Sequence, residues 1–224
     1  GSFTADTHGS RSSGRGRAST LININSALHM GETITFQNVY TYGSNYYSLG
    51  VSGPIGYKGI TASLRGSVMD YNLGTPLKST KPQGDSKEIS LSLNFPTISY
   101  NNLTASFSFG ASFNEYLNRT TSGVTSEKTN LKSNLDINLG LVDNFLGGGL
   151  NTLSLSFSHG EIDLGDNLSD LNSDSTTAKT QGNYEKIGLN FSRTQILNDR
   201  NSLFFSTNGQ YGFKNLDSAE QISL

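Results

Sequence analysis

Cysteine is absent from this sequence of 224 residues, and charge is scarce. Lys, Arg, Asp and Glu together make up 15% of the chain, against about 25% in a typical soluble domain. The missing cysteines exclude disulfide frameworks, thiolate metal sites and cysteine nucleophiles. The formal net charge of -2 offers no basic surface for a phosphate backbone, so we expect no nucleic-acid partner.

Long hydrophobic runs are missing as well. No stretch approaches the ~20 consecutive apolar residues that a membrane helix needs, and no secretory signal with a basic start and an apolar centre is present. Hydrophobic residues make up only 33% of the chain, which is unusual for an enzyme with a packed core. Aromatic residues nevertheless make up 10%. This argues against disorder, because disordered chains are poor in aromatics.

What the sequence has in quantity is alternation. In 103–114, Leu, Ala and Phe alternate with Thr, Ser, Gly and Asn, and 130–141 repeats the pattern with Leu and Ile against Asn, Lys and Asp. Successive side chains point to opposite faces of an extended strand, so each segment has one apolar and one polar face. An eleventh strand is predicted to begin near Glu220, after ten others at 15–25, 33–41, 46–53, 60–72, 87–99, 103–117, 129–142, 149–164, 183–197 and 202–215.

Two properties of these segments indicate a membrane. Many exceed ten residues, whereas globular strands average ~5–6, and about ten tilted residues are what a strand needs to cross a bilayer. Their polar faces consist mainly of Ser, Thr, Asn and Gly, which suit the hydrated lumen of a barrel whose apolar face meets lipid. The predicted fold is therefore all-β, a transmembrane antiparallel β-barrel. A soluble β-sandwich or a repetitive surface adhesin would also alternate, and both stay open as alternatives.

Recognisable catalytic and ligand patterns are absent. There is no G-x-S-x-G elbow, and the three histidines have no paired metal-ligand spacing. The run GSRSSGRGR precedes a strand pattern, not the helix that a phosphate loop requires. We expect no enzyme and no cofactor or metal. Four aspartates lie in or beside one long connection, namely Asp163, Asp166, Asp170 and Asp174. Their spacing matches no EF-hand pattern, so we interpret this connection as a solvated loop and not as a calcium site.

Four stretches, taken in chain order, resemble a single family. The turn NSALHMGET and the stretch YYSLGVSGPIGYKG lie between two longer motifs. The first motif, DTHGSRSSGRGR, contains Asp6, Gly9, Ser10, Arg11, Gly14 and Arg17. The last, NLDSAEQISL, contains Ser218, Glu220 and Gln221. In this order they resemble the barrel of two-partner secretion transporters, the TpsB proteins of the ShlB/FhaC/HecB haemolysin secretion and activation family.

This resemblance implies a 16-stranded outer-membrane β-barrel of a Gram-negative bacterium, of which the chain would hold about strands 1–11. Residues 1–14 would be a hinge from periplasmic (POTRA) domains, and residues 15–224 the N-terminal part of the barrel. The motif around Glu220 would open strand eleven. We expect the rest of such a barrel to lie outside this sequence.

The function that the resemblance implies is secretion of a large partner exoprotein, a haemolysin or a filamentous adhesin, without nucleotide hydrolysis at the barrel. The partners would be that exoprotein and outer-membrane lipid. Whether the exoprotein is also activated stays open. A porin-like channel for small solutes is the main alternative, but it should show charge ladders and should lack the four motifs.

Five sparse charges are placed inside the lumen by strand parity, namely Arg65, Lys132, Asp136, Lys186 and Lys214. They either line a conduit and tune its conductance or form a static salt network, and both readings stay open. Three connections are predicted to be long, at 73–86, 118–128 and 165–182. Long barrel loops usually lie outside the cell. The family topology, with strand 15–25 entering from the periplasm, instead puts them in the periplasm, and we expect that topology.

Overall fold

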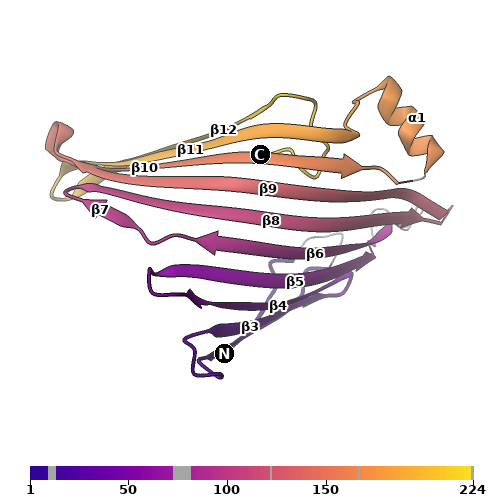
Figure 1. The fold of residues 1–224 in the computed structure, drawn as a ribbon, viewed down its shortest axis with the longest axis horizontal. Coiled ribbons are helices and arrows are strands. Elements are labelled where there is room, and N and C mark those ends of the chain that lie inside the picture. The colour runs from indigo at the N-terminus through magenta and orange to yellow at the C-terminus, as the bar shows by residue number, and fades with distance from the viewer. Residues whose placement is uncertain (10–13, 73–81, 122, 166, 223–224) are drawn as a thin grey trace.

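The computed structural model describes residues 1–9, 14–72, 82–121, 123–165 and 167–222. They form one antiparallel sheet of twelve strands, in which spatial order follows chain order and β7 pairs with β8 off the main path (Figure 1). The strands are β1 Ser2–Asp6, β2 Arg17–Asn25, β3 Thr33–Thr41, β4 Ser44–Ile55, β5 Ile60–Asn72, β6 Gln83–Asn94, β7 Ile98–Tyr100, β8 Leu103–Thr120, β9 Gly123–Asp143, β10 Gly149–Asp163, β11 Gly182–Asn198 and β12 Asn201–Gly212. A 3-10 turn, η1, spans Phe145–Gly147, and one α-helix, α1, spans Leu168–Thr176.

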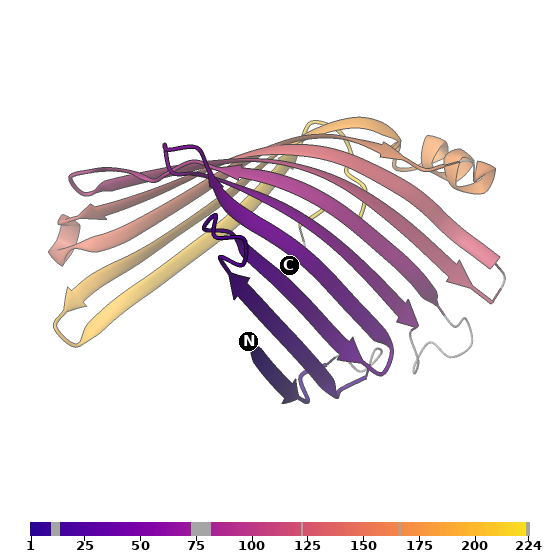
Figure 2. The same ribbon diagram turned by 60° about the horizontal axis from the view of Figure 1, so that its bottom comes forward.

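The sheet curves into an open trough, with β1–β5 forming one side and β10–β12 the other, and the C-terminus lies within the hollow (Figure 2). Since neighbouring strands are antiparallel, the connections alternate between two ends. Of the described residues, the α1 end carries 7–9, 14–16, 42–43, 164–165 and 167–181, and the η1 end carries 26–32, 56–59 and 144–148. The trough has the curvature and strand pairing of part of a barrel wall.

The apolar side chains lie mostly on the outer, convex face and stay exposed. Leu49 is 59% exposed, Leu131 58% and Ile89 54%. A water-soluble protein rarely leaves so large an apolar surface uncovered. The buried hydrophobic residues of the described chain are only Ile162, Leu164 and Tyr184. No described helix is long and apolar enough to cross a bilayer.

The ten strands predicted from alternation are all present, although several of their ends are shifted, and two assignments differ. β1 was not predicted, because five residues of SFTAD carry too short a pattern. The predicted strand 87–99 is divided into β6 and β7. Pro96 lies between them, and proline has no N–H to donate to a sheet ladder.

One predicted connection is wrong, a second contains a helix, and the predicted eleventh strand is not seen in the described residues. The supposed long connection 118–128 is mostly paired strand, because β8 continues to Thr120 and β9 begins at Gly123, so that polar residues extend the hairpin. The connection 165–182, read as a solvated loop, contains α1, whose N-terminus is capped by the Asn167 side chain accepting the Ser169 N–H at 3.1 Å. In the residues described up to 222, no strand begins near Glu220, which lies in a turn and folds back into the hollow.

Candidate functional site: the concave wall and its docked segment

The convex face has an apolar band of the height expected for a membrane. On β9 this band runs from Leu131 to Leu141, ten residues apart. Ten residues span about 33 Å along a strand. At a tilt of about 45° they rise by roughly 23 Å, close to the ~25 Å apolar band of outer-membrane barrels.

Charged pairs border this band on both sides. Toward the α1 end, Lys87 Nζ lies 3.3 Å from Glu115 Oε2. Toward the η1 end, Arg193 Nη1 lies 2.6 Å from Asp143 Oδ2. Sequence analysis missed these pairs, although a charge at the end of an alternating apolar run was the signal that could have found them.

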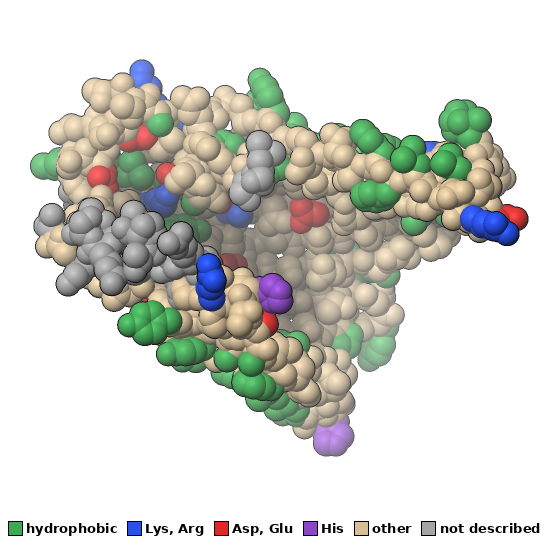
Figure 3. Space-filling model, turned by 180° about the vertical axis from the view of Figure 1, so that it is seen from behind, with side chains coloured by type: hydrophobic (Ala, Val, Ile, Leu, Met, Phe, Trp, Pro, Cys, Tyr) green, Lys and Arg blue, Asp and Glu red, His purple; other side chains and the backbone are tan. Residues whose placement is uncertain are grey.

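The concave face is lined by small polar side chains in cross-strand rows. One row runs through Ser106, Asn138, Ser154, Asn190 and Asn208 on five neighbouring strands. Figure 3 shows this hollow as a wall of uncharged side chains and backbone with few charged groups, and hydrophobic side chains at its outer margins. Such a wall offers exchangeable hydrogen bonds without an apolar contact surface.

The C-terminal segment, defined as residues 214–222, lies across this wall and is fixed by Glu220. The Glu220 carboxylate accepts hydrogen bonds from Lys186 Nζ at 2.5 Å, Lys132 Nζ at 3.1 Å and Asn130 Nδ2 at 2.6 Å. Glu220 is 4% exposed and Asn130 is fully buried. Tyr184 donates its hydroxyl to Asn130 Oδ1 at 3.1 Å and completes the cluster. We call this group the Glu220 cluster.

Two opposing effects act on the Glu220 carboxyl. Burial raises its pKa, but the Lys186 and Lys132 ammonium groups outweigh burial and hold the pKa below its ordinary value. The carboxylate is therefore charged at neutral pH. A buried ion is stable only where partners and hydrogen bonds compensate its lost hydration, and here two cations and an amide do so.

Further contacts fix the segment along its length. Lys128 Nζ lies 2.5 Å from Asp217 Oδ1. Gln210 donates to the Glu220 carbonyl at 2.8 Å and accepts the Ile222 N–H at 2.9 Å. A groove of about 550 Å³ remains between the segment and the wall. The segment thus narrows the hollow without filling it.

The connection that holds α1 docks on the same segment. Asn215 Nδ2 donates to the Ala178 carbonyl at 2.9 Å. Leu216 of the C-terminal segment and Leu171 of α1 both pack against a small buried cluster, which consists of Ile162, Leu164 and Tyr184. The helix and the segment therefore form one unit over the α1 end of the hollow.

The five predicted lumen charges have different surroundings. Lys132 and Lys186 belong to the Glu220 cluster. Arg65 lies on the concave wall, where its guanidinium donates to the Tyr46 hydroxyl at 2.7 Å. Asp136 accepts from Asn134 Nδ2 at 2.5 Å. Lys214 follows the end of β12 and donates to backbone carbonyls of the α1 connection, including that of Gln181.

The described members of the amino-terminal motif close the hairpin of β1 and β2. Asp6 and Arg17 are paired in register, with 2.8 Å between Arg17 Nη2 and Asp6 Oδ2. Gly14 has a φ of 102° and lies against Tyr42, where a side chain would clash. Gly9 donates its N–H to the Arg15 carbonyl at 2.9 Å. Ser10 and Arg11 lie outside the described residues.

The last motif is divided between the wall and the segment itself. Glu220 contacts the wall, as described above. Gln221 turns back and donates to the Leu216 carbonyl at 2.8 Å. Ser218 lies in the turn that precedes Glu220. The sequence selected Glu220 and the two lysines as separate candidates, and the fold brings them together.

The turn NSALHMGET also has an internal anion. Glu32 accepts the backbone N–H of Leu28 at 2.5 Å and that of Met30 at 3.0 Å. The backbone N–H donors of Leu28 and of Glu32 itself hold the pKa of this carboxyl below its ordinary value. Gly31, at a φ of 76°, permits the turn. This turn shapes the η1 end of the wall.

A family model for the haemolysin secretion/activation protein ShlB/FhaC/HecB matches residues 1–224. The chain belongs to this family. Its fold resembles the solved structure of CdiB from Escherichia coli with a TM-score of 0.77, at 18% identity over 97% of this chain and 41% of CdiB. CdiB from Acinetobacter baumannii gives a TM-score of 0.59 at 15% identity, over 90% of this chain and 36% of that one.

A third similar structure is BamA from Haemophilus ducreyi lacking POTRA domains 1–3, with a TM-score of 0.54 at 15% identity. It is covered to 41%, and 98% of this chain aligns. No curated protein sequence matches. The chain therefore spans about two-fifths of the solved structures that it resembles. The ShlB/FhaC/HecB chain forms part of a transmembrane antiparallel β-barrel of the Gram-negative outer membrane.

Proposed function

We propose that the protein containing this chain secretes a large partner exoprotein, such as a haemolysin or a filamentous adhesin, by two-partner secretion. The observation that carries the proposal is the concave wall of serine and asparagine with a polar segment docked across it. Family membership supports the same function. The barrel acts as a conduit, with no catalysis and no nucleotide hydrolysis, and its convex band contacts outer-membrane lipid.

The chemistry of the wall suits passage of an extended polypeptide. A passing backbone exchanges its hydrogen bonds with water for hydrogen bonds of similar strength with serine and asparagine side chains. No position on the wall therefore holds the chain tightly. Apolar side chains would retain hydrophobic segments of the exoprotein, and the described concave rows place mainly serine, asparagine and glycine at these positions, with a few charged residues. A porin-like channel could use the same wall, but the docked segment narrows it.

The C-terminal segment, residues 214–222, is the element that must move away from the wall during transport. The Glu220 cluster fixes it to β9 and β11 by hydrogen bonds and ion pairs, which exchange with water, and Leu216 adds an apolar contact. We propose that an incoming exoprotein replaces these polar contacts and displaces the segment. The lumen charges Lys132 and Lys186 then act as a latch for Glu220.

Strand count supports an orientation with the α1 end outside the cell. The family topology begins with a strand that enters from the periplasm, and β1, not β2, is the first strand of the sheet. The connection 7–16 then lies outside, together with the helix-bearing connection 164–181. This agrees with the general rule that the longer loops of outer-membrane barrels are extracellular. We propose this orientation in place of the periplasmic placement expected from the sequence.

The test is a chromosomal deletion of the region that encodes residues 14–222 in the native bacterium. We expect one large exoprotein to disappear from the culture medium, with small-solute uptake unchanged. Comparative proteomics of the medium and a solute-uptake assay give the two readouts. An unchanged exoprotein profile with altered solute permeability would support the porin-like alternative.

A further inference from the structure

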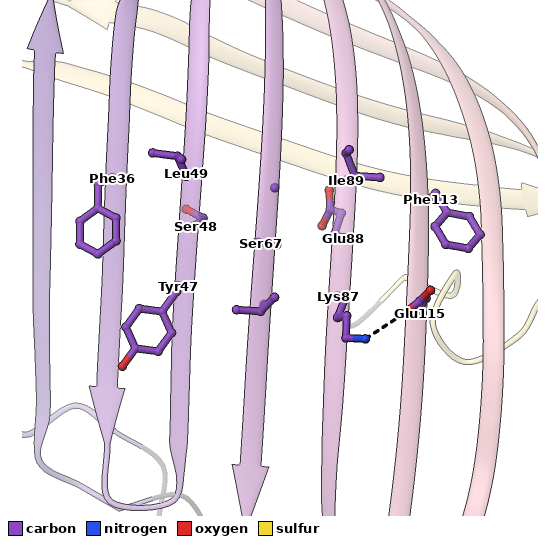
Figure 4. Close-up of a pocket in the computed structure, with 12 residues that line it drawn as sticks. Phe36, Tyr47, Ser48, Leu49, Ser67, Lys87, Glu88, Ile89, Phe113 and Glu115 are labelled. Carbon is purple, nitrogen blue, oxygen red and sulfur yellow. Dashed lines mark hydrogen bonds and ion pairs between the residues drawn. The ribbon is translucent and has the colours of Figure 1, made fainter.

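Two grooves of similar volume lie on opposite faces of the sheet. The convex groove, of about 530 Å³, lies over Gly66 between Leu49 and Ile89 and opens onto the apolar band (Figure 4). The concave groove, of about 550 Å³, lies between the wall and the C-terminal segment. The concave groove leads to the charged groups of the Glu220 cluster, so its chemistry can select a ligand.

The concave groove extends from the Glu220 cluster toward the η1 end. Lys132 and Lys186 border it at the cluster. Asp136, Gly188 and Asn190 border it farther along β9 and β11, toward the η1 end. In the orientation proposed above, this is the periplasmic end. A polypeptide that enters there can therefore reach both lysines along the groove before the segment has moved.

Three lysines beneath the segment obtain their carboxylate partners from the segment alone, among the residues that the structure describes. Lys132 and Lys186 contact Glu220, and Lys128 contacts Asp217. The side chains of Lys132, Lys186 and Lys128 are only 27%, 16% and 11% exposed. Removing one partner of a buried ion pair is strongly unfavourable, because it leaves a charge with little hydration and no counterion. Displacement of the segment therefore leaves three ammonium groups that need new carboxylates.

The wall also binds the backbone of the segment. Gln210 donates to the Glu220 carbonyl at 2.8 Å and accepts the Ile222 N–H at 2.9 Å. Lys186 Nζ donates to the same Glu220 carbonyl at 3.0 Å. Every peptide has these main-chain groups. The backbone contacts therefore suit any polypeptide, and the ion pairs are what distinguish an acidic side chain from a neutral one.

We propose that Lys128, Lys132 and Lys186 form a binding site for two carboxylate side chains of the exoprotein, with the spacing of Asp217 and Glu220. This inference rests on the proposed function and names the chemistry of the exoprotein segment that displaces the C-terminal segment. One carboxylate replaces another, so no lysine loses its counterion during the exchange. A neutral leading segment would leave the three cations unpaired and would displace the segment poorly.

The first test measures binding of a fluorescent peptide of residues 214–222 to the purified whole protein by fluorescence anisotropy. The protein carries Glu220→Gln, which weakens its own segment. We expect this peptide to bind about tenfold more tightly than the same peptide with its glutamate replaced by glutamine, the effect of one charged hydrogen bond. Adding Lys132→Gln and Lys186→Gln to the protein should remove this difference.

The matched control for the peptide test adds Lys58→Gln and Lys87→Gln instead, which changes the charge equally at two exposed lysines away from the concave groove. The preference for the acidic peptide should then persist. Equal affinities of the two peptides for the Glu220→Gln protein, or a preference that survives loss of Lys132 and Lys186, would overturn the proposal.

A second test distinguishes a carboxylate site from a latch alone. In cells, Lys132→Gln with Lys186→Gln should lower exoprotein release by about tenfold at equal abundance of the barrel, because the exoprotein loses its charged contacts. If the lysines served only to hold Glu220, their loss would leave release undiminished, and that result would overturn the proposal. The peptide test needs no exoprotein, so the proposed function and this inference can fail independently.

Discussion

At the scale of single residues, Glu220 is the side chain on which the arrangement of the hollow depends most. It is 4% exposed and meets two lysines on different strands of the wall. Hydrogen bonds to charged groups contribute about 1.5–3 kcal/mol each, so the loss of one shifts an equilibrium by about tenfold or more. Docking of the C-terminal segment should therefore respond to a change at this one residue.

We predict that Glu220→Gln raises the ratio of open to closed current by about tenfold, as expected for the loss of one charged hydrogen bond. Single-channel recording of the whole protein in planar bilayers measures this ratio. Glu161→Gln is the control, because Glu161 is an exposed carboxylate on the convex side of β10. An unchanged ratio in Glu220→Gln would show that the segment is held by other contacts.

The same residue determines an acid response. Because the pKa of Glu220 lies below its ordinary value of 4.5 in the folded protein, its ion pairs are fully present above about pH 4.5. They are lost as the pH falls through the lowered pKa. The open fraction should rise on acidification below that point, and the Glu220→Gln variant should lack this component of the rise.

At the scale of elements, the turn between β9 and β10 is held by a side chain from a third strand. Gln195 on β11 donates from Nε2 to the carbonyls of Phe145 and Gly148, at 3.0 and 2.9 Å. Gly147 and Gly148 adopt positive φ angles in this turn. The turn is therefore not determined by its own residues alone.

We predict that Gln195→Leu destabilises the barrel by about 0.5–1.5 kcal/mol, the net contribution of a lost hydrogen bond, because the Phe145 and Gly148 carbonyls still accept the backbone N–H groups of Gly148 and Ile196. Heat-dependent mobility on semi-native gels gives the unfolding temperature. Gln221→Leu serves as the control, since Gln221 is exposed and bonds within its own segment. Equal unfolding temperatures for the unaltered protein and Gln195→Leu would show that β10 and η1 hold the turn without this amide.

At the scale of the whole molecule, the orientation proposed above depends on counting β1 as the strand that enters from the periplasm. The docked segment, α1 and residues 7–9 and 14–16 lie toward one end of the trough. The exoprotein would then leave the barrel beside the α1 unit.

The absence of cysteine from this chain makes orientation measurable, because an introduced thiol has no competitor within it. We predict that Ser169→Cys on α1 reacts with a membrane-impermeant maleimide in intact cells. Tyr57→Cys at the η1 end, fully exposed in the fold, should react only after permeabilisation. The reverse pattern would place the α1 end in the periplasm.

Alternation by itself determined the strands and their two faces, because side-chain direction along an extended chain has a period of two. The apolar residues 131–141 and the small polar residues beside them were assignable from the sequence. The family motifs also selected Glu220 before any contact was known. These are local properties, which neighbouring residues specify.

Only the tertiary structure determined which residues distant in sequence contact one another. Glu220 is 88 residues from Lys132 in sequence and 34 from Lys186, and no periodic pattern relates positions so far apart. Gly66 forms a groove only because register places Leu49 and Ile89 beside it. Residues 214–222 lie against the concave wall because their charges find partners there, and such pairing depends on the curvature of the described sheet.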